Sequence, residues 1–234
     1  MNESSKLLSI WRCQVEKDMA ELVLPDGCRD LIATIDAYGK VDMLITGIDK
    51  NAYEVNVKKG STVIGLRLKA GSRFCWERQV QNQMQTQINH LEACSALLTA
   101  MENRLDQSEA YLLQAIEDWV VEPDPLVLDF ISSVNEHQSY QPDFMSDRSL
   151  RRKLVALGGA PPRYWLGLKR VRQTGLALLQ SSKSLAEIAI EQQYSDQAHM
   201  SRDLKAWFGS SPKKLRDQQS RYWDNLRSND AFNS

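Results

Sequence analysis

Arginine and amide side chains recur at two places in the C-terminal part of this 234-residue chain, fifty residues apart. A guanidinium group can pair with guanine or with a phosphate, and a glutamine amide can pair with adenine in the major groove. Such side chains on the outward face of a helix therefore predict contacts to DNA. The predicted contact residues are Ser146, Asp147, Arg148, Ser149, Arg151 and Arg152 in the first set, and Asp196, Gln197, His199 and Arg202 in the second.

Both sets belong to an internal repeat. The segment SDRSLRRKLVALGGAPPRYW, which starts at Ser146, aligns with DQAHMSRDLKAWFGSSPKKL, which starts at Asp196. Apolar residues stand four apart in each copy, which places them on one face of a helix, while the arginines fall on another face. In each copy a glycine is followed three residues later by a proline, which is typical of one helix ending and the next beginning. The sequence therefore predicts one helical unit used twice.

The residues before the second copy predict a helix-turn-helix unit. Ser184 is suited to cap a helix, and Glu187 three positions on completes a capping box. A turn is expected at residues 192–194, so the helix that follows would present its first residues to base edges. Two of those residues have a local alternative, because Asp196 could serve only as a cap and His199 only as a packing residue.

The first copy is expected to form a less regular unit. Its partner helix is predicted at residues 126–135, where apolar residues have helical spacing. Ser146 is a suitable N-cap for the recognition helix that follows. Pro142 stands just before this helix, where it would break the usual supporting helix. We therefore expect a distorted first unit.

Charge is distributed unevenly along the chain. Residues 1–145 hold 13 Lys and Arg against 22 Asp and Glu, a net charge of −9, whereas residues 146–227 hold 16 against 7, a net charge of +9. A basic region beside an acidic one is expected of a DNA-binding domain beside a domain that does not bind, because phosphate neutralisation supplies much of the affinity for a duplex. Further basic residues expected to meet phosphates are Arg170, Lys205, Lys213 and Lys214.

The order of predicted elements favours an α+β fold. From about Ile10 to Phe74, short segments rich in Val, Ile, Thr and Tyr alternate with turn residues and predict strands. From Trp76 to Val121 there is no glycine or proline, and the apolar spacing predicts two or three helices. The expected organisation is a β-rich sensing or regulatory domain, a helical connector that dimerises or packs within the monomer, an all-helical DNA-binding domain and a polar tail, at residues 1–75, 76–121, 122–220 and 221–234.

Residues 125–216 resemble the DNA-binding domain of AraC/XylS-type regulators. The resemblance rests on the patterns S-x-R-x-L-x-R-x-L, G-x-x-P-x-x-W, S-x-A-E-I-A and Y-S-D-Q-A-H-M-S-R-D-L-K. It implies a seven-helix domain in which a long helix, at about residues 163–180, presents two helix-turn-helix units to one face of DNA, where successive major-groove segments lie roughly 34 Å apart. The chain departs from the family pattern at Gln193, where a turn glycine is usual, and at Met200 and Leu204, which replace phenylalanines.

A weaker resemblance covers the N-terminal part. LPDGCRDLI at residues 24–32 and GLRLKAG at residues 65–71 are similar to the small β-rich domain that precedes some AraC-type domains. This implies an architecture and no particular ligand. Arg29 and Arg67 are candidates for binding an anionic effector, although internal pairs with acidic residues such as Asp26 or Asp30 are favoured.

Several other classes of function are not supported. The four cysteines form no C-x-x-C pair and the three histidines meet no ligand spacing, so we expect buried free thiols and neither a metal nor a cofactor. The chain has no G-x-S-x-G, P-loop, G-x-G-x-x-G or H-E-x-x-H motif, so no enzyme is predicted. It also has no apolar run of about 18 residues and no signal peptide, which predicts a cytoplasmic protein without membrane association.

These patterns predict a bacterial transcriptional regulator that binds specific double-stranded DNA. Regulation is expected through the N-terminal domain, by a small-molecule or protein effector, and RNA polymerase and a second copy of the chain are further expected partners. The alternative is a protein-interaction module with the same fold and weakened DNA binding, as Pro142 and Gln193 would suggest. The sequence leaves open whether the protein activates or represses.

Overall fold

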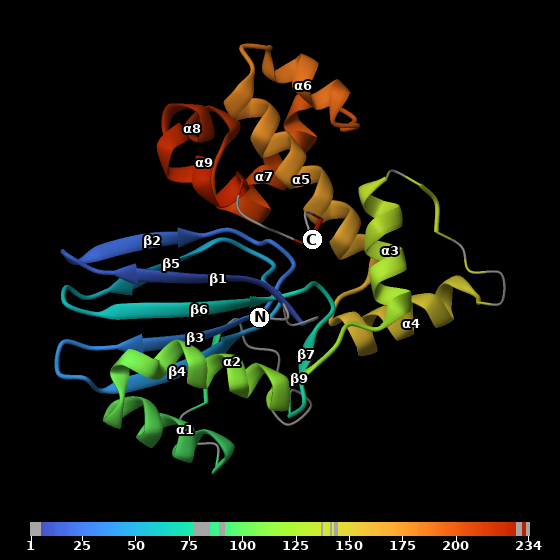
Figure 1. Cartoon of the computed structure of the whole chain (residues 1–234). Coiled ribbons are helices and arrows are strands. Elements are labelled where there is room, and N and C mark those ends of the chain that lie inside the picture. Colours follow the sequence, from blue (N-terminus) through green and yellow to red (C-terminus); the bar gives the residue numbers. More distant parts are fainter. Residues whose placement is uncertain are drawn as a thin grey trace.

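The computed structural model describes residues 6–76, 85–88, 92–136, 138–140, 142, 145–227 and 231–232. Figure 1 shows a β-rich N-terminal region, two helices packed against it, and a helical C-terminal region on its other side. The α+β organisation predicted from the sequence is confirmed.

Antiparallel strands form the N-terminal region. The main sheet has the strand order β1-β6-β3-β4-β8, and its strands are β1 (Leu7–Gln14), β3 (Asp30–Ile35), β4 (Val41–Thr46), β6 (Thr62–Leu68) and β8 (Gln85–Gln87). Two shorter pairs join it: β2 (Met19–Val23) with β5 (Tyr53–Val57), and β7 (Arg73–Phe74) with β9 (Val120–Val121).

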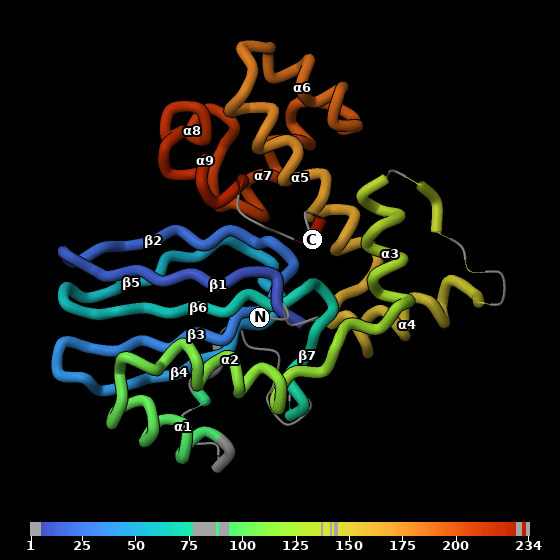
Figure 2. Tube along the Cα trace, in the orientation of Figure 1, coloured from blue at the N-terminus to red at the C-terminus, as the bar shows by residue number. Residues whose placement is uncertain are grey.

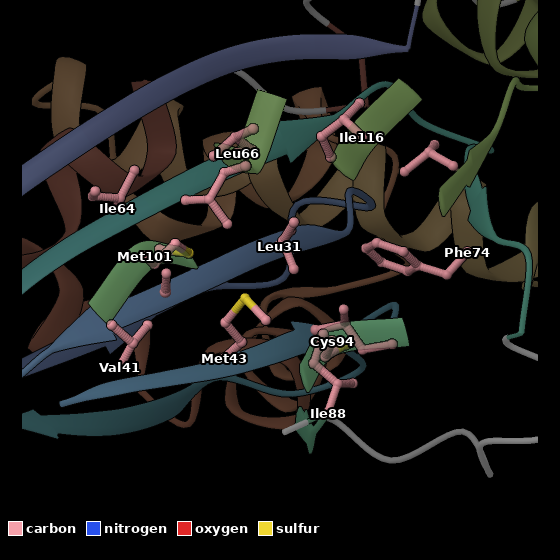
Figure 3. Close-up of a cluster of buried hydrophobic side chains, with 14 of the residues drawn as sticks. Leu31, Val41, Met43, Ile64, Leu66, Phe74, Ile88, Cys94, Met101 and Ile116 are labelled. Carbon is pink, nitrogen blue, oxygen red and sulfur yellow. The ribbon is translucent and has the colours of Figure 1, made fainter. Parts of the chain in front are cut away.

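Alternating apolar residues place the core on one face of this sheet. In β3, Leu31, Ala33 and Ile35 are buried, while the residues between them are only partly covered. The helices α1 (Glu92–Asn103) and α2 (Ser108–Trp119), joined by the short 3-10 helix η1 (Leu105–Gln107), lie over that face. Figure 3 shows Met101 and Ile116 from these helices among the strand side chains. Burial of each such side chain contributes about 1.5–3 kcal/mol.

The C-terminal region consists of helices arranged around one long helix. These are α3 (Pro125–Asn135), α4 (Asp147–Gly158), α5 (Pro162–Gln180), α6 (Leu185–Glu191), α7 (Gln197–Phe208), α8 (Pro212–Asp217) and α9 (Gln219–Arg227). The long helix α5 matches the linking helix expected at residues 163–180. Figure 2 shows α5 running from the α3–α4 pair to the α6–α7 pair.

Residues 221–227 and 231–232, the described part of the C-terminal segment, include buried side chains, although the sequence indicated only a polar tail. Tyr222 and Leu226 stand four apart on α9, so they share a face, and both are buried. Ala231 and Phe232 are buried as well, and the amide of Ala231 donates to the carbonyl oxygen of Asp26 at 2.9 Å. This end of the chain therefore connects the helical region to the β-rich region.

Candidate nucleic-acid interface

The fifty-residue repeat is present in the structure as two equivalent helices. Helix α7 begins and ends fifty residues after α4, and each is closed by a glycine in the left-handed conformation, with φ of +81° at Gly159 and +67° at Gly209. A glycine suits this position because it has no Cβ to clash with the backbone. The following helices begin at Pro162 and Pro212, as the spacing predicts.

Helix α4 presents a basic face to solvent. The hydroxyl of Ser146 caps the helix by accepting from the amide of Ser149 at 3.3 Å. Leu150 and Leu154 are buried beneath the helix, with 5% and 0% exposure. The outward face carries charged side chains that are all exposed, namely Asp147, Arg148, Arg151 and Arg152. Three guanidinium groups are thus available on the face away from the core.

Helix α7 presents a more mixed face. Gln197, Arg202 and Lys205 are exposed, whereas Met200 and Leu204 are fully buried on the opposite side, so these two replacements of phenylalanine keep the core apolar.

Asp196 and His199, for which the sequence also allowed a purely local role, both make contacts near the start of α7. The carboxylate of Asp196 accepts from the amide of His199 at 2.6 Å, so Asp196 is the N-cap of α7. The His199 ring meets the Tyr194 ring edge-on, and its Nδ1 lies 3.1 Å from the Ser195 hydroxyl. His199 is therefore partly held by packing, and Gln197 and Arg202 are the less constrained side chains on this face.

Helix α6 and a tight turn support α7 from behind. The Ser184 hydroxyl accepts from the Glu187 amide at 3.2 Å, and the Glu187 carboxylate accepts from the Ser184 amide at 2.8 Å, which confirms the predicted capping box. Ile188 and Ala189 are buried against α7 and α5. Gln193 has a φ of +60°, in the region where glycine is favoured. The backbone therefore needs at this turn the conformation that a glycine usually supplies.

Arg170 on α5 is engaged within the protein. Its guanidinium forms an ion pair with Asp203 at 3.0 Å and lies over the Tyr194 ring at 4.5 Å. The Tyr194 hydroxyl also donates to Asp203 at 3.1 Å. This triad fixes α7 and the turn onto α5. The Arg170 side chain is still 35% exposed, so a phosphate contact remains compatible with its position.

The first unit is less regular than the second. The described residues between α3 and α4, which are 136, 138–140, 142, 145 and 146, are not helical, in keeping with the effect expected of Pro142. An open hollow of about 430 Å³ lies beside α4, between α3 and the start of α5. Its apolar lining includes Phe130, Val134, Leu150 and Leu166.

Arg29 and Arg67 are directed inward. Arg67 forms ion pairs with Asp26 and Asp30, each at 3.0 Å, and the buried Arg29 donates to the carbonyl oxygen of Ser72 at 3.0 Å. Burial raises the pKa of Asp26 to about 6, although the charge of Arg67 opposes this rise. The internal pairs favoured by the sequence are therefore present for Arg67, and both arginines contribute to the protein's own polar network.

Sequence reasoning missed Arg172, which is 2% exposed on α5. Its guanidinium donates to the carbonyl oxygens of Pro25, Asn225 and Leu226 at 3.0, 3.0 and 3.1 Å. It therefore holds the β-rich region, α5 and α9 together. The available signal was its position four residues after Leu168, which places it on the apolar face of the helix.

The cysteines follow the sequence prediction only in part. Cys28 and Cys94 are buried free thiols, but Cys13 and Cys75 are exposed, so the expectation of burial was wrong for these two. Cys13 lies in β1, at the edge of the main sheet, where the last four residues of the strand are all exposed. Within the described ranges, no three His, Cys, Asp or Glu side chains gather as metal ligands would. No helix in those ranges has the length and apolar character needed to cross a membrane.

Solved structures of ToxT from Vibrio cholerae are similar to the structure of this chain. An apo variant of ToxT has a TM-score of 0.42 and 11% identity, with 92% of this chain and 98% of that chain covered. ToxT bound to (E)-4-(8-methylnaphthalen-1-yl)but-3-enoic acid has a TM-score of 0.40 and 10% identity, with 90% and 98% covered. Unsaturated fatty acid bound ToxT has a TM-score of 0.38 and 11% identity, with 92% and 97% covered. No curated protein matches the sequence.

A protein-family model matches part of the C-terminal region. Residues 144–218 match a model described as a helix-turn-helix domain, and this range contains α4, α5, α6, α7 and α8. It also contains both copies of the repeat and the exposed side chains of α4 and α7 described above. The chain therefore carries a helix-turn-helix domain of the AraC type at residues 144–218.

Proposed function

We propose that this protein regulates transcription by reading specific DNA sequences with α4 and α7, and that its N-terminal region controls this reading. The observation that carries the proposal is the repeated recognition helix, with its apolar side buried and its polar side exposed in both copies. Both helices are anchored on α5, which lets them act as a pair on successive major-groove segments.

The side chains divide into two groups by the contacts proposed for them. Base edges would be read from the outward faces of the helices by Arg148, Arg151, Arg152, Gln197, His199 and Arg202, while Ser146, Asp147, Ser149 and Asp196 border the same surface. Phosphates would be met by Lys205, Lys213, Lys214 and the exposed part of Arg170. Base contacts carry the sequence specificity, and phosphate contacts fix the position on the duplex.

Regulation is assigned to the N-terminal part of the chain. We assign sensing to residues 1–75, connection or dimerisation to residues 76–121, and DNA binding to residues 122–220. A small-molecule or protein effector would act by binding two arrangements of these parts with different affinities. RNA polymerase and a second copy of the chain are the further partners in this proposal.

The experiment is selection from random duplexes by the full-length protein at a stated salt concentration. We expect a motif with two half-sites about one helical turn apart. Arg152→Ala should degrade one half-site and Arg202→Ala the other, each by about 1–3 kcal/mol if the arginine reads a base. Arg104→Ala, which removes an exposed arginine from the N-terminal region, is the matched control and should leave the motif intact.

Two results would reject the proposal. If no sequence is enriched, or if the enriched motif is indifferent to both substitutions, the protein does not read DNA with these helices. The protein-interaction module with the same fold would then be the better account.

A further inference from the structure

The two halves of the helix-turn-helix domain have separate cores. Leu150 and Leu154 of α4 pack with Trp165 at the start of α5, whereas Met200 and Leu204 of α7 belong to the cluster around the later part of α5. A helix of this length extends about 28 Å. The relative placement of α4 and α7 therefore depends on α5 and on whatever else touches both halves.

The loop between β4 and β5, residues 47–52, contacts both halves. The carbonyl oxygen of Asp49 accepts from the Tyr164 hydroxyl on α5 at 2.7 Å, in a buried position. The amide of Ala52 donates to the carbonyl oxygen of Trp207 on α7, also at 2.7 Å. When the Asn51 side-chain amide is oriented with its nitrogen toward hydrogen-bond acceptors, this nitrogen donates to the carbonyl oxygen of Ala206 at 2.8 Å.

The same loop also reaches the end of α4. A Cβ added to Gly159, the C-cap of α4, would lie 3.0 Å from the Cδ1 atom of Ile48, so this loop side chain is packed closely against the cap. The contact is a packing one, since Ile48 belongs to the apolar cluster that includes Leu154 and Tyr164. One six-residue loop therefore touches the C-terminal ends of both recognition helices.

These contacts leave the DNA-facing ends of the helices free. The last carbonyl groups of a helix have no partners within it, so donors from another segment can fix that end. Here the donors come from the N-terminal region and meet the end of α7, while Gln197, His199 and Arg202, which are proposed to read bases, lie in the first half of this helix. Trp207 strengthens the junction, because its ring packs on that of Tyr164 at 5.3 Å and contacts both apolar clusters.

We propose that the β4–β5 loop sets the separation and relative orientation of α4 and α7, and thereby the half-site spacing that the protein accepts. The consequence for DNA rests on the proposed function, whereas the consequence for helix placement does not. Asn51 and Tyr164 act as positioning residues in this account, since their contacts hold the helices and do not reach the base-reading surface.

The helix placement is tested by a distance measurement without DNA. Spin labels are attached at Val155→Cys on α4 and Ala198→Cys on α7, both at exposed positions, after Cys13 and Cys75 have been replaced by serine. We expect a single narrow distance distribution in this parent protein. The distribution is then compared with that of variants in which the loop contacts are removed.

The variants are Tyr164→Phe, Asn51→Ala and their combination. Each should broaden or shift the distance distribution, and the combination should do so most. Tyr111→Phe is the matched control, because it removes a hydroxyl on α2 that donates to Gln107, the residue just before this helix, far from the loop. The proposal is overturned if folded single variants, verified by circular dichroism, and the combination all give the parent distribution.

A second measurement concerns the DNA. This measurement uses unlabelled protein, with the wild type as the parent, because Ala198 adjoins Gln197, which is proposed to read a base. The parent should discriminate against duplexes whose half-sites are moved apart by one or two base pairs, and the combined variant should lose this discrimination by about tenfold in relative affinity. An unchanged spacing preference overturns the proposed role in reading. If the parent binds no duplex while the distances still depend on the loop, the proposed function fails and the role of the loop in helix placement stands.

Discussion

Gln193, in the turn between α6 and α7, has a backbone conformation that favours glycine although it carries a side chain. Its φ of +60° places it in the left-handed region, and its amide donates to the carbonyl oxygen of Ile190 at 3.0 Å. For a residue with a Cβ this conformation costs about 1–2 kcal/mol. The turn between α6 and α7 is thus formed despite the side chain and is held by the packing of the helices on either side.

Replacing Gln193 with glycine should therefore stabilise the protein. Relief of the left-handed strain exceeds the added entropy of the unfolded chain, so we expect a gain of about 0.5–1 kcal/mol in the free energy of unfolding. Urea denaturation measures it. Gln192→Gly is the control, because Gln192 has a φ of −91° and gains no such relief. Equal effects at both positions would show that the strain at Gln193 is not significant.

Asp49 contributes a pH dependence to stability. It is 8% exposed, and its Oδ1 has no hydrogen-bond partner within the described ranges. Burial raises the pKa of this carboxyl to about 7, although a hydrogen bond from Tyr53 opposes the rise. A raised folded-state pKa gives stability that is complete below the unfolded pKa and is lost as the pH rises through about 7.

We accordingly expect the free energy of unfolding to fall between pH 5 and pH 8, with Asp49 contributing on the order of 2 kcal/mol to that fall. Asp49→Asn should flatten the profile and stabilise the protein at pH 8. Some slope should persist, because Asp26 has a pKa of about 6 and acts in the same direction. Glu16→Gln, at an exposed position, should leave the profile unchanged. A variant profile as steep as the wild type would contradict this assignment.

The helices of the repeat were predictable because their signals are local. Ser146 and Asp196 cap α4 and α7, Gly159 and Gly209 end them, and each cap acts within four residues of its partner. The absence of helix among the described residues just before α4 was predictable from Pro142 for the same reason. The start of α5 was predictable from Pro162, which is suited to a first helical turn, whereas its extent, about residues 163–180, was implied by the family resemblance.

Contacts between distant segments were not predictable in this way. The hydrogen bond from Tyr164 to Asp49 joins residues 115 positions apart, and nothing near either residue indicates it. The same holds for Arg172 with Pro25, which are 147 positions apart. The packing of α9 was missed because its buried face consists of Tyr222 and Leu226, with Trp223 partly buried beside them, and that face is too short to be distinct in a polar segment.

Helix α6 offers a test of the support that α7 receives. Ser184→Ala removes one half of the capping box, and we expect a loss of about 1 kcal/mol in the free energy of unfolding, because the Glu187 amide loses its acceptor. Ser182→Ala, just outside the helix and exposed, should change stability very little. A loss of similar size at both positions would show that the capping box does not stabilise α6.

For the whole molecule, the main feature is the segregation of charge between two regions that pack together. Residues 1–145 carry a net charge of −9 and residues 146–227 a net charge of +9. The contacts between the regions include Arg172 with Pro25, the β4–β5 loop with α5 and α7, and the ion pair of Arg221 with Glu54. Under the proposed function, a duplex would be attracted to residues 146–227 and repelled by residues 1–145, and the outward faces of α4 and α7 stay exposed.

Footprinting of the full-length protein on its selected duplex tests the central claim most directly. The account predicts two protected segments, with centres about 10 base pairs apart on one face of the DNA. Arg152→Ala should weaken protection of one segment, Arg202→Ala should weaken the other, and Arg104→Ala should weaken neither. A single protected segment, or two segments that fade together with either substitution, would contradict reading by two separate recognition helices.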